Sequence, residues 1–217
     1  MKKNNQKNLY ISLCIIISFV LWTFLIRCVD VKAIGPMVST VGFATINQSV
    51  HNFTGVNISL YIITDWLGLV PIFFAFGFAL LGLFQWIKRQ HLKHVDYSIF
   101  VLGGFYIVVI GVYILFETVV VNYRPILING YLEPSYPSST TLLVMCVMPT
   151  AIMQFNERIK NNLLRKYVNL SITVFIIFMV IGRLISGVHW FTDILGGAIL
   201  SAGLVMMYSY VVSLKDK

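Results

Sequence analysis

A chain of 217 residues, of which 58% are hydrophobic and only 11% are charged, has too few charged residues to cover a soluble domain. Its formal net charge of +8 comes from Lys and Arg residues in short clusters between apolar runs. This pattern is typical of membrane topology and excludes a folded basic surface for nucleic acid. The composition therefore predicts an integral membrane protein.

Six apolar segments are each long enough to cross the hydrocarbon core of a bilayer, which takes about 20 residues. In chain order they are residues 9–27, 62–87, 98–117, 139–155, 168–186 and 191–213. The first segment is longer than the core of a signal peptide and no cleavage pattern follows it, so we expect an uncleaved helix. The sequence predicts an all-α fold, a bundle of six transmembrane helices in a single domain over residues 1–217.

The stretch from Asp30 to about Tyr61 is too polar to span a membrane. We expect it to form an external segment between the first two transmembrane helices, with an amphipathic helix at the membrane surface. Three N-x-S/T matches fall in this stretch, at Asn47, Asn52 and Asn57. We interpret them as chance matches in an Asn-rich segment.

The basic residues indicate the orientation of the chain, because cytoplasmic segments carry an excess of Lys and Arg. Twelve of the 16 fall on one side of the six predicted helices: Lys2, Lys3, Lys7, Lys88, Arg89, Lys93, Arg158, Lys160, Arg165, Lys166, Lys215 and Lys217. The other four are Arg27, Lys32, Arg124 and Arg183. We expect a multi-pass protein of the cell membrane with both termini in the cytoplasm.

Polar residues cluster where the fifth predicted helix ends and the sixth begins, on the predicted outer side. His189 and Asp193 are four residues apart, so on a helix they share a face. A carboxylate that accepts a hydrogen bond from one imidazole nitrogen leaves the other free as a base or nucleophile. Arg183 adds a guanidinium fork that suits phosphate oxygens. The alternative is an interfacial His beside an Asp that the helix dipole favours.

Two further clusters lie on the same predicted side. Ser138 and Ser139 follow a proline at a helix start, where a hydroxyl cap and free backbone N–H groups form an anion site, or simply a helix cap. Arg124 follows the third helix and offers a second guanidinium fork, or an anchor whose long side chain reaches the lipid headgroups. Two Arg residues, a Ser-rich helix start and a His–Asp pair at one face favour a phosphate site.

The order Arg124-Pro125, then Pro137-Ser138, then Arg183-x5-His189-x3-Asp193 resembles the type 2 phosphatidic acid phosphatase superfamily, which is related to the vanadium haloperoxidases. The resemblance covers residues 98–205 and agrees with the six-helix count. It implies that His189 attacks phosphorus to form a phosphohistidine and that Asp193 orients it. It also implies that Arg124, Arg183, Ser138 and Ser139 bind the phosphate.

The chain departs from the family pattern at three positions. Glu117 stands where a phosphate-binding Lys is expected, Thr140 where a His protonates the leaving oxygen, and Gly182 where a Ser is usual. Loss of a general acid commonly costs about 10²–10⁴ in rate, and less for a leaving group that is stable as an anion. The departures therefore favour a lipid diphosphate over phosphatidate. For Glu117 we consider three hypotheses: it donates the missing proton, it pairs with Arg124, or it is a solvated Glu at a helix end.

The resemblance predicts a metal-independent membrane lipid phosphatase whose substrate is a lipid phosphate or diphosphate, such as a polyprenyl diphosphate. The alternatives are a lipid phosphotransferase and a catalytically impaired homologue that binds anionic lipid headgroups. Three cysteines without paired spacing predict neither a zinc site nor a disulfide framework. We expect no metal, no cofactor and no nucleic-acid partner. We interpret Asp65, Tyr131 and Glu133 as solvated residues near the membrane surface.

Overall fold

The computed structural model describes the backbone of residues 2–215 and the side chains of residues 6–215. Apart from isolated bridges, the described residues form helices without strands. The α-helices are α1 (Lys2–Cys28), α2 (Ala44–Thr54), α3 (Ile58–Leu67), α4 (Leu69–Arg89), α5 (Tyr97–Thr118), α6 (Ser139–Arg158), α7 (Asn162–Ile185) and α8 (Phe191–Val212). Short 3-10 helices cover Pro36–Val38 and Leu92–His94. The predicted all-α fold is confirmed.

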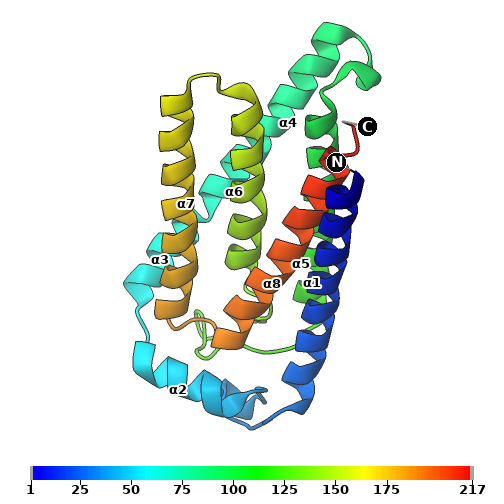
Figure 1. The fold of residues 1–217 in the computed structure, drawn as a ribbon. Helices are drawn as coiled ribbons and strands as arrows, with labels where there is room; N and C mark the ends of the chain where they lie inside the picture. The colour runs from blue at the N-terminus through cyan, green and yellow to red at the C-terminus, as the bar shows by residue number, and fades with distance from the viewer. Residues whose placement is uncertain (1, 216–217) are drawn as a thin grey trace.

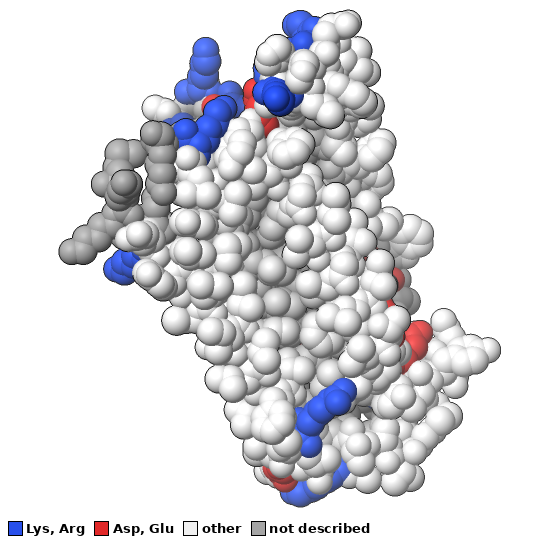
Figure 2. Space-filling model, turned by 90° about the vertical axis from the view of Figure 1, so that its right-hand side faces the viewer, with Lys and Arg blue, Asp and Glu red and all other residues white. Residues whose placement is uncertain are grey.

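Six segments of the described chain are long and apolar enough to cross a membrane. They are Gln6–Cys28, Ile58–Arg89, Tyr97–Thr118, Ser139–Arg158, Asn162–Ile185 and Phe191–Val212, and each overlaps one predicted segment. Figure 2 shows Lys and Arg side chains mainly towards the two ends of the molecule, with a broad and mostly uncharged band between them. The molecule is therefore a multi-pass membrane protein with six spanning segments in its described part.

The second spanning segment differs from the single helix that we expected over residues 62–87. It consists of two helices, α3 and α4, which meet at Gly68. Pro71 explains the break, because proline has no N–H to donate to the carbonyl of Leu67 and its ring clashes with that carbonyl. The break matters for the site, since it lets α3 lie against α7 while α4 runs obliquely across the bundle (Figure 1).

Helix α8 packs along α1 and α6, and α6 is the most buried spanning helix. Small residues allow these close contacts. A Cβ atom added at Gly196 would lie 2.5 Å from the ring of Tyr136, and one added at Gly203 would lie 2.8 Å from Ile16. The Ser12 hydroxyl of α1 also donates a 2.9 Å hydrogen bond to the Gly203 carbonyl. Helices α1 and α8 are therefore packed closely together.

Helix α2, the predicted amphipathic helix, lies across one end of the bundle (Figure 1). Its Asn47 is fully buried and fastens it to the start of α8. The Asn47 amide donates to Thr192 Oγ1 at 3.0 Å and to the Gly42 carbonyl at 2.8 Å, and its oxygen accepts from the Thr192 N–H at 3.1 Å. A buried amide with these bonds cannot carry a glycan in the folded protein, which agrees with our interpretation of the Asn47 match.

We expect Asn47→Ala to lower the free energy of unfolding by about 2–3 kcal/mol, because it leaves the buried N–H of Thr192 without an acceptor. Thermal unfolding of the detergent-purified protein measures this as a lower midpoint. Asn52→Ala is the matched control, since Asn52 is exposed on the same helix. Equal midpoints for the two variants would contradict the role of Asn47 in holding α2 against the start of α8.

The end of the bundle opposite α2 carries a cluster of charged side chains. Asp96 pairs with Arg89 at 2.9 Å and with Arg158 at 3.5 Å, and the start of α1 and the end of α8 lie towards this side (Figure 1). Lys88 and Lys215 belong to the same end by their position on α4 and after α8. The side chains of Lys2 and Lys3, and the whole of Lys217, lie outside the described residues.

Candidate active site

Two connections meet at the α2 end of the bundle, the loop from α5 to α6 and the turn from α7 to α8. The start of α6 lies at the same end. The α5–α6 loop folds back on itself, since the Arg124 N–H donates to the Glu133 carbonyl at 3.0 Å and the Ser135 N–H donates to the Asn122 carbonyl at 2.9 Å. The Trp190 indole N–H donates to the Tyr123 carbonyl at 2.7 Å. The loop that carries Arg124 is therefore tied to the turn that carries His189.

The α7–α8 turn depends on Gly187, whose φ of +69° lies in the region that side chains disfavour. A Cβ atom at this position would lie 2.0 Å from the Gly55 carbonyl oxygen, so the turn packs directly on the connection from α2 to α3. The Asn57 N–H also donates to the Ser186 carbonyl at 3.0 Å. These contacts fix the backbone two residues before His189.

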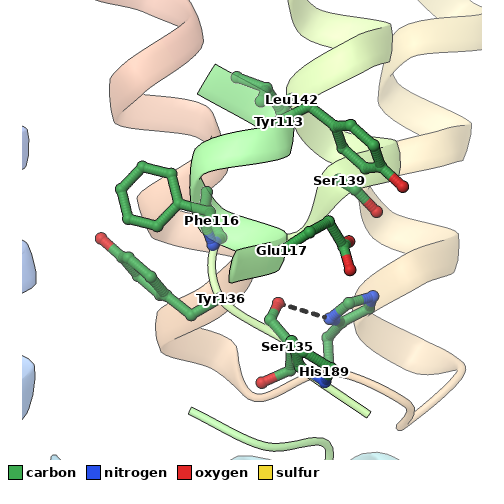
Figure 3. Close-up of a pocket in the computed structure, with 10 residues that line it drawn as sticks. Tyr113, Phe116, Glu117, Ser135, Tyr136, Ser139, Leu142 and His189 are labelled. Atoms are coloured by element: carbon green, nitrogen blue, oxygen red, sulfur yellow. Dashed lines mark hydrogen bonds between the residues drawn. The ribbon is translucent and has the colours of Figure 1, made fainter. Parts of the chain in front are cut away.

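His189 is 3% exposed and its two ring nitrogens have different surroundings. Nδ1 lies 3.1 Å from the Ser135 carbonyl oxygen (Figure 3), and a carbonyl can only accept, so Nδ1 carries the proton and donates. Nε2 lies 3.3 Å from Arg183 Nη2 and 3.5 Å from Arg124 Nη1. The unprotonated nitrogen of His189 therefore faces two guanidinium groups.

The imidazole of His189 is held in its neutral form. Burial lowers its pKa well below the ordinary value of 6.5, and the positive charges of Arg124 and Arg183 lower it further. The hydrogen bond to the Ser135 carbonyl acts in the opposite direction but is the smaller effect. A neutral imidazole with a free Nε2 lone pair is the form that can act as a nucleophile.

Arg183 is 1% exposed, and helix α3 holds it in place. Its Nη1 lies 3.4 Å from the Thr64 hydroxyl and 3.5 Å from the Asp65 carboxylate, and its guanidinium lies 5.1 Å from the centre of the Tyr61 ring. Arg124 is held from the other side by an ion pair with Glu133 at 3.1 Å. The structure thus brings the two predicted Arg residues together at His189, although 59 residues separate them in the chain.

The Asp193 carboxylate does not form the hydrogen bond to His189 that their spacing in the sequence predicts. Its Oδ2 is 3.9 Å from His189 Nδ1, beyond hydrogen-bond distance, and that nitrogen is bonded to the Ser135 carbonyl instead. The reason is that α8 begins at Phe191 after an extended Trp190, so His189 precedes the helix and does not share a helical face with Asp193. The predicted His189–Asp193 hydrogen bond is therefore wrong for this structure.

The fully buried Asp193 instead joins the three clusters. Its carboxylate accepts from the Trp190 N–H at 2.9 Å and from the Asn122 amide at 3.1 Å, while its backbone carbonyl accepts from the Ser138 N–H at 3.1 Å. Charge-assisted bonds of this kind are stronger than neutral ones. Asp193 therefore orders the loops that carry His189 and Arg124.

Ser138, Ser139 and Thr140, at the start of α6, have different surroundings. Ser138 caps the helix, since its hydroxyl accepts from the Thr141 N–H at 3.4 Å and from the Thr141 hydroxyl at 3.0 Å. Ser139 lines the small pocket that contains His189 (Figure 3). Thr140 does not line that pocket but faces a neighbouring cavity of about 510 Å³. Of these three residues, Ser139 is the one that lines a pocket together with His189.

Glu117 lines the His189 pocket from the end of α5 (Figure 3). The hypothesis that it pairs with Arg124 is wrong for this structure, because Arg124 pairs with Glu133 in the loop. Glu133 is therefore more than the solvated residue that we predicted. Among the described residues no group of three or more His, Cys, Asp or Glu side chains is placed to hold a metal ion.

Sequence reasoning missed Tyr61, Thr64 and Ser135 as parts of this site. Tyr61, Thr64 and Asp65 have the spacing of one helix face, and polar residues on one face of an apolar span indicate a buried partner. The spacing of Tyr61 and Thr64 in the sequence could therefore have indicated their place in the site. Ser135 acts through its backbone carbonyl, which no residue pattern can reveal.

The fold and the site define an all-α membrane protein in which two guanidinium groups face one nitrogen of a buried histidine. Residues 118–217 match the model of the PAP2 superfamily. The structure is similar to the "first transmembrane PAP2 type phosphatidylglycerolphosphate phosphatase from Bacillus subtilis", with a TM-score of 0.59 and 17% identity over 91% of this chain and 94% of that chain. No curated protein sequence matches this chain. The expected resemblance to the PAP2 superfamily is confirmed.

Proposed function

We propose that the protein is a membrane lipid phosphatase that hydrolyses a lipid phosphate or diphosphate through a phosphohistidine on His189, without a metal ion. The observation that carries the proposal is the free Nε2 of His189 within 3.5 Å of both guanidinium groups. A phosphoryl group entering between them exchanges these weak contacts for charge-assisted hydrogen bonds. The match to the PAP2 superfamily supports the same chemistry.

The reaction has two steps. In the first, the Nε2 lone pair of His189 attacks phosphorus and the bond to the leaving oxygen breaks, while Arg124 and Arg183 stabilise the charge on the phosphoryl oxygens. In the second, water attacks the phosphohistidine and releases phosphate. Ser139 and the N-terminus of α6 support the phosphoryl group, since helix N-termini favour anions. Asp193 is a positioning residue that orders the loops around His189.

The substrate that we favour is a lipid diphosphate such as a polyprenyl diphosphate. Thr140 stands where the family has an acid His, and a threonine hydroxyl is a poor proton donor. A lipid monophosphate leaves from a diphosphate without a proton far more readily than an alkoxide leaves from phosphatidate. The cavity of about 510 Å³ beside Ser139, which is lined mainly by apolar side chains, suits the lipid chain.

We place the active site on the outer face of the cell membrane and both termini in the cytoplasm, in one integral membrane domain over residues 1–217. The basic cluster with Arg89 and Arg158 supports this orientation, because it lies at the end opposite α2 and the positive side faces the cytoplasm.

Phosphate release by the detergent-purified protein in EDTA, with polyprenyl diphosphate and phosphatidate offered in parallel, tests the proposal. We expect release from both lipids and faster release from the diphosphate. Transfer of the phosphoryl group to an added alcohol at the expense of free phosphate would favour a phosphotransferase. A folded protein that binds the lipids but releases no phosphate would overturn the proposal in favour of a binding homologue.

The pH dependence of kcat/KM gives a further prediction. Burial, Arg124 and Arg183 lower the pKa of His189 below 6.5, so the neutral nucleophile persists into mildly acidic solution. Arg124→Gln removes one of the charges that oppose protonation, which raises the pKa of His189 and moves the acid limb of kcat/KM to higher pH. Comparing the two proteins on one substrate cancels the titration of the lipid. An unchanged acid limb would contradict the electrostatic coupling.

A further inference from the structure

Two side chains of α5 lie at the boundary between the His189 pocket and the apolar cavity. Tyr113 and Glu117 are four residues apart and therefore neighbours on the helix surface. The His189 pocket is lined by Glu117, Tyr113 and Ser139, and the cavity of about 510 Å³ is lined by Tyr113, Ser139 and Thr140. Because the two spaces share Tyr113 and Ser139, they adjoin at this point of α5.

The scissile bond of a lipid substrate belongs at this junction. The phosphoryl group is drawn to Nε2 of His189, where Arg124 and Arg183 converge, and the apolar chain is drawn to the cavity. The oxygen that links the two parts must then pass Tyr113 and Glu117. Figure 3 shows the Glu117 carboxyl group on the pocket side of α5, between Ser139 and His189 in this view.

Glu117 supplies the one carboxyl group among the described residues that line this pocket. The salt bridges of the described carboxylates include Glu133 with Arg124 and Asp65 with Arg183, but none involves Glu117. The Glu117 carboxyl group is thus not held by a described Lys or Arg side chain, and it lines the same pocket as His189.

We propose that Glu117 is the acid–base residue of this enzyme and replaces the missing acid His. The proposal rests on the lipid phosphatase function proposed above. As Nε2 of His189 bonds to phosphorus and the P–O bond breaks, the Glu117 carboxyl gives its proton to the leaving oxygen. The resulting carboxylate then takes a proton from the water that attacks the phosphohistidine. The P–N bond breaks, the lone pair returns to Nε2, and Glu117 is again protonated.

Glu117→Gln tests this role because the two steps respond differently to the substrate. With phosphatidate, whose leaving group needs a proton, we expect kcat/KM to fall by about 10²–10⁴-fold. With polyprenyl diphosphate we expect the first turnover to proceed within a few-fold of the wild-type rate. Later turnovers become slow, because the water step has lost its base. Rapid quenching then shows a burst of one equivalent of polyprenyl monophosphate, which a merely structural defect does not produce.

Two variants separate this role from charge or folding effects. Glu117→Lys restores the cation of the family pattern, and we expect it to lose phosphatidate hydrolysis as Glu117→Gln does. Glu157→Gln is the matched control, because Glu157 bonds to Ser98 and Arg158 at the other end of α6. It should retain the wild-type rate with both lipids.

Each outcome bears on one proposal. Wild-type rates of Glu117→Gln or Glu117→Lys with phosphatidate would overturn the role of Glu117 and leave the phosphatase function standing. A wild-type protein that hydrolyses the diphosphate but never phosphatidate would also overturn the acid role. Absence of any His189-dependent release from wild-type protein is the separate result that overturns the proposed function.

Discussion

We expect His189→Ala to reduce phosphate release from polyprenyl diphosphate by at least about 10⁴-fold, because the reaction then has no nucleophile. Arg124 and Arg183 remain in place in this variant and still attract the phosphate, so lipid binding should persist. Measuring phosphate release and lipid binding side by side separates the two effects. The His189 side chain makes few contacts, with the Ser135 carbonyl at 3.1 Å and two Arg side chains at 3.3 and 3.5 Å, so its loss should not unfold the bundle.

The matched control is His94→Ala, since His94 is exposed in the connection between α4 and α5 at the opposite end of the molecule. It should keep the wild-type rate. Residual hydrolysis by His189→Ala at more than about a tenth of the wild-type rate would show that another group attacks phosphorus, and the proposed mechanism would then be wrong.

The second large effect is expected for Arg183→Lys, which should lower kcat by about 10²–10³-fold. Lysine keeps the positive charge but loses the planar fork that binds two phosphoryl oxygens at once. It also loses the geometry set by Thr64, Asp65 and the Tyr61 ring. Steady-state kinetics with polyprenyl diphosphate measures the effect as a loss in kcat that exceeds any rise in KM.

Arg165→Lys is the matched control on the same helix, because Arg165 is only half-buried and bonds locally to Asn162 at the other end of α7. Thermal unfolding of both variants checks that the bundle is intact. Full activity of a folded Arg183→Lys protein would mean that a point charge suffices at this position. The proposed binding of two phosphoryl oxygens by the Arg183 guanidinium would then be wrong.

The spanning helices could be predicted from sequence because a long apolar run is a local property, and a bilayer admits few backbone structures. The break at Gly68 was missed because Pro71 lies inside a run of otherwise continuous hydrophobicity. The role of Asn47 was missed for a different reason. Its partner Thr192 is 145 residues away, and no pattern in a single sequence predicts such a contact.

The candidate site could likewise be predicted only in part from the sequence. Intramembrane charges are rare enough to indicate function by themselves, which is why Arg183 and His189 stood out. The His189–Asp193 spacing misled, because the i,i+4 rule holds only inside a helix and α8 begins two residues after His189. The contacts that hold Arg183 come from α3, 119 residues earlier for Thr64, and required the fold.

In the proposed mechanism phosphorus bonds to His189 during turnover. This bond can be detected by acid-free rapid quenching of the EDTA-treated protein with lipid diphosphate labelled in its terminal phosphate, followed by peptide mapping. We expect transient label on the peptide that contains His189, stable to alkali and lost in acid, with more label in Glu117→Gln and none in His189→Ala. Steady release of labelled phosphate while His189 never carries label would contradict this mechanism.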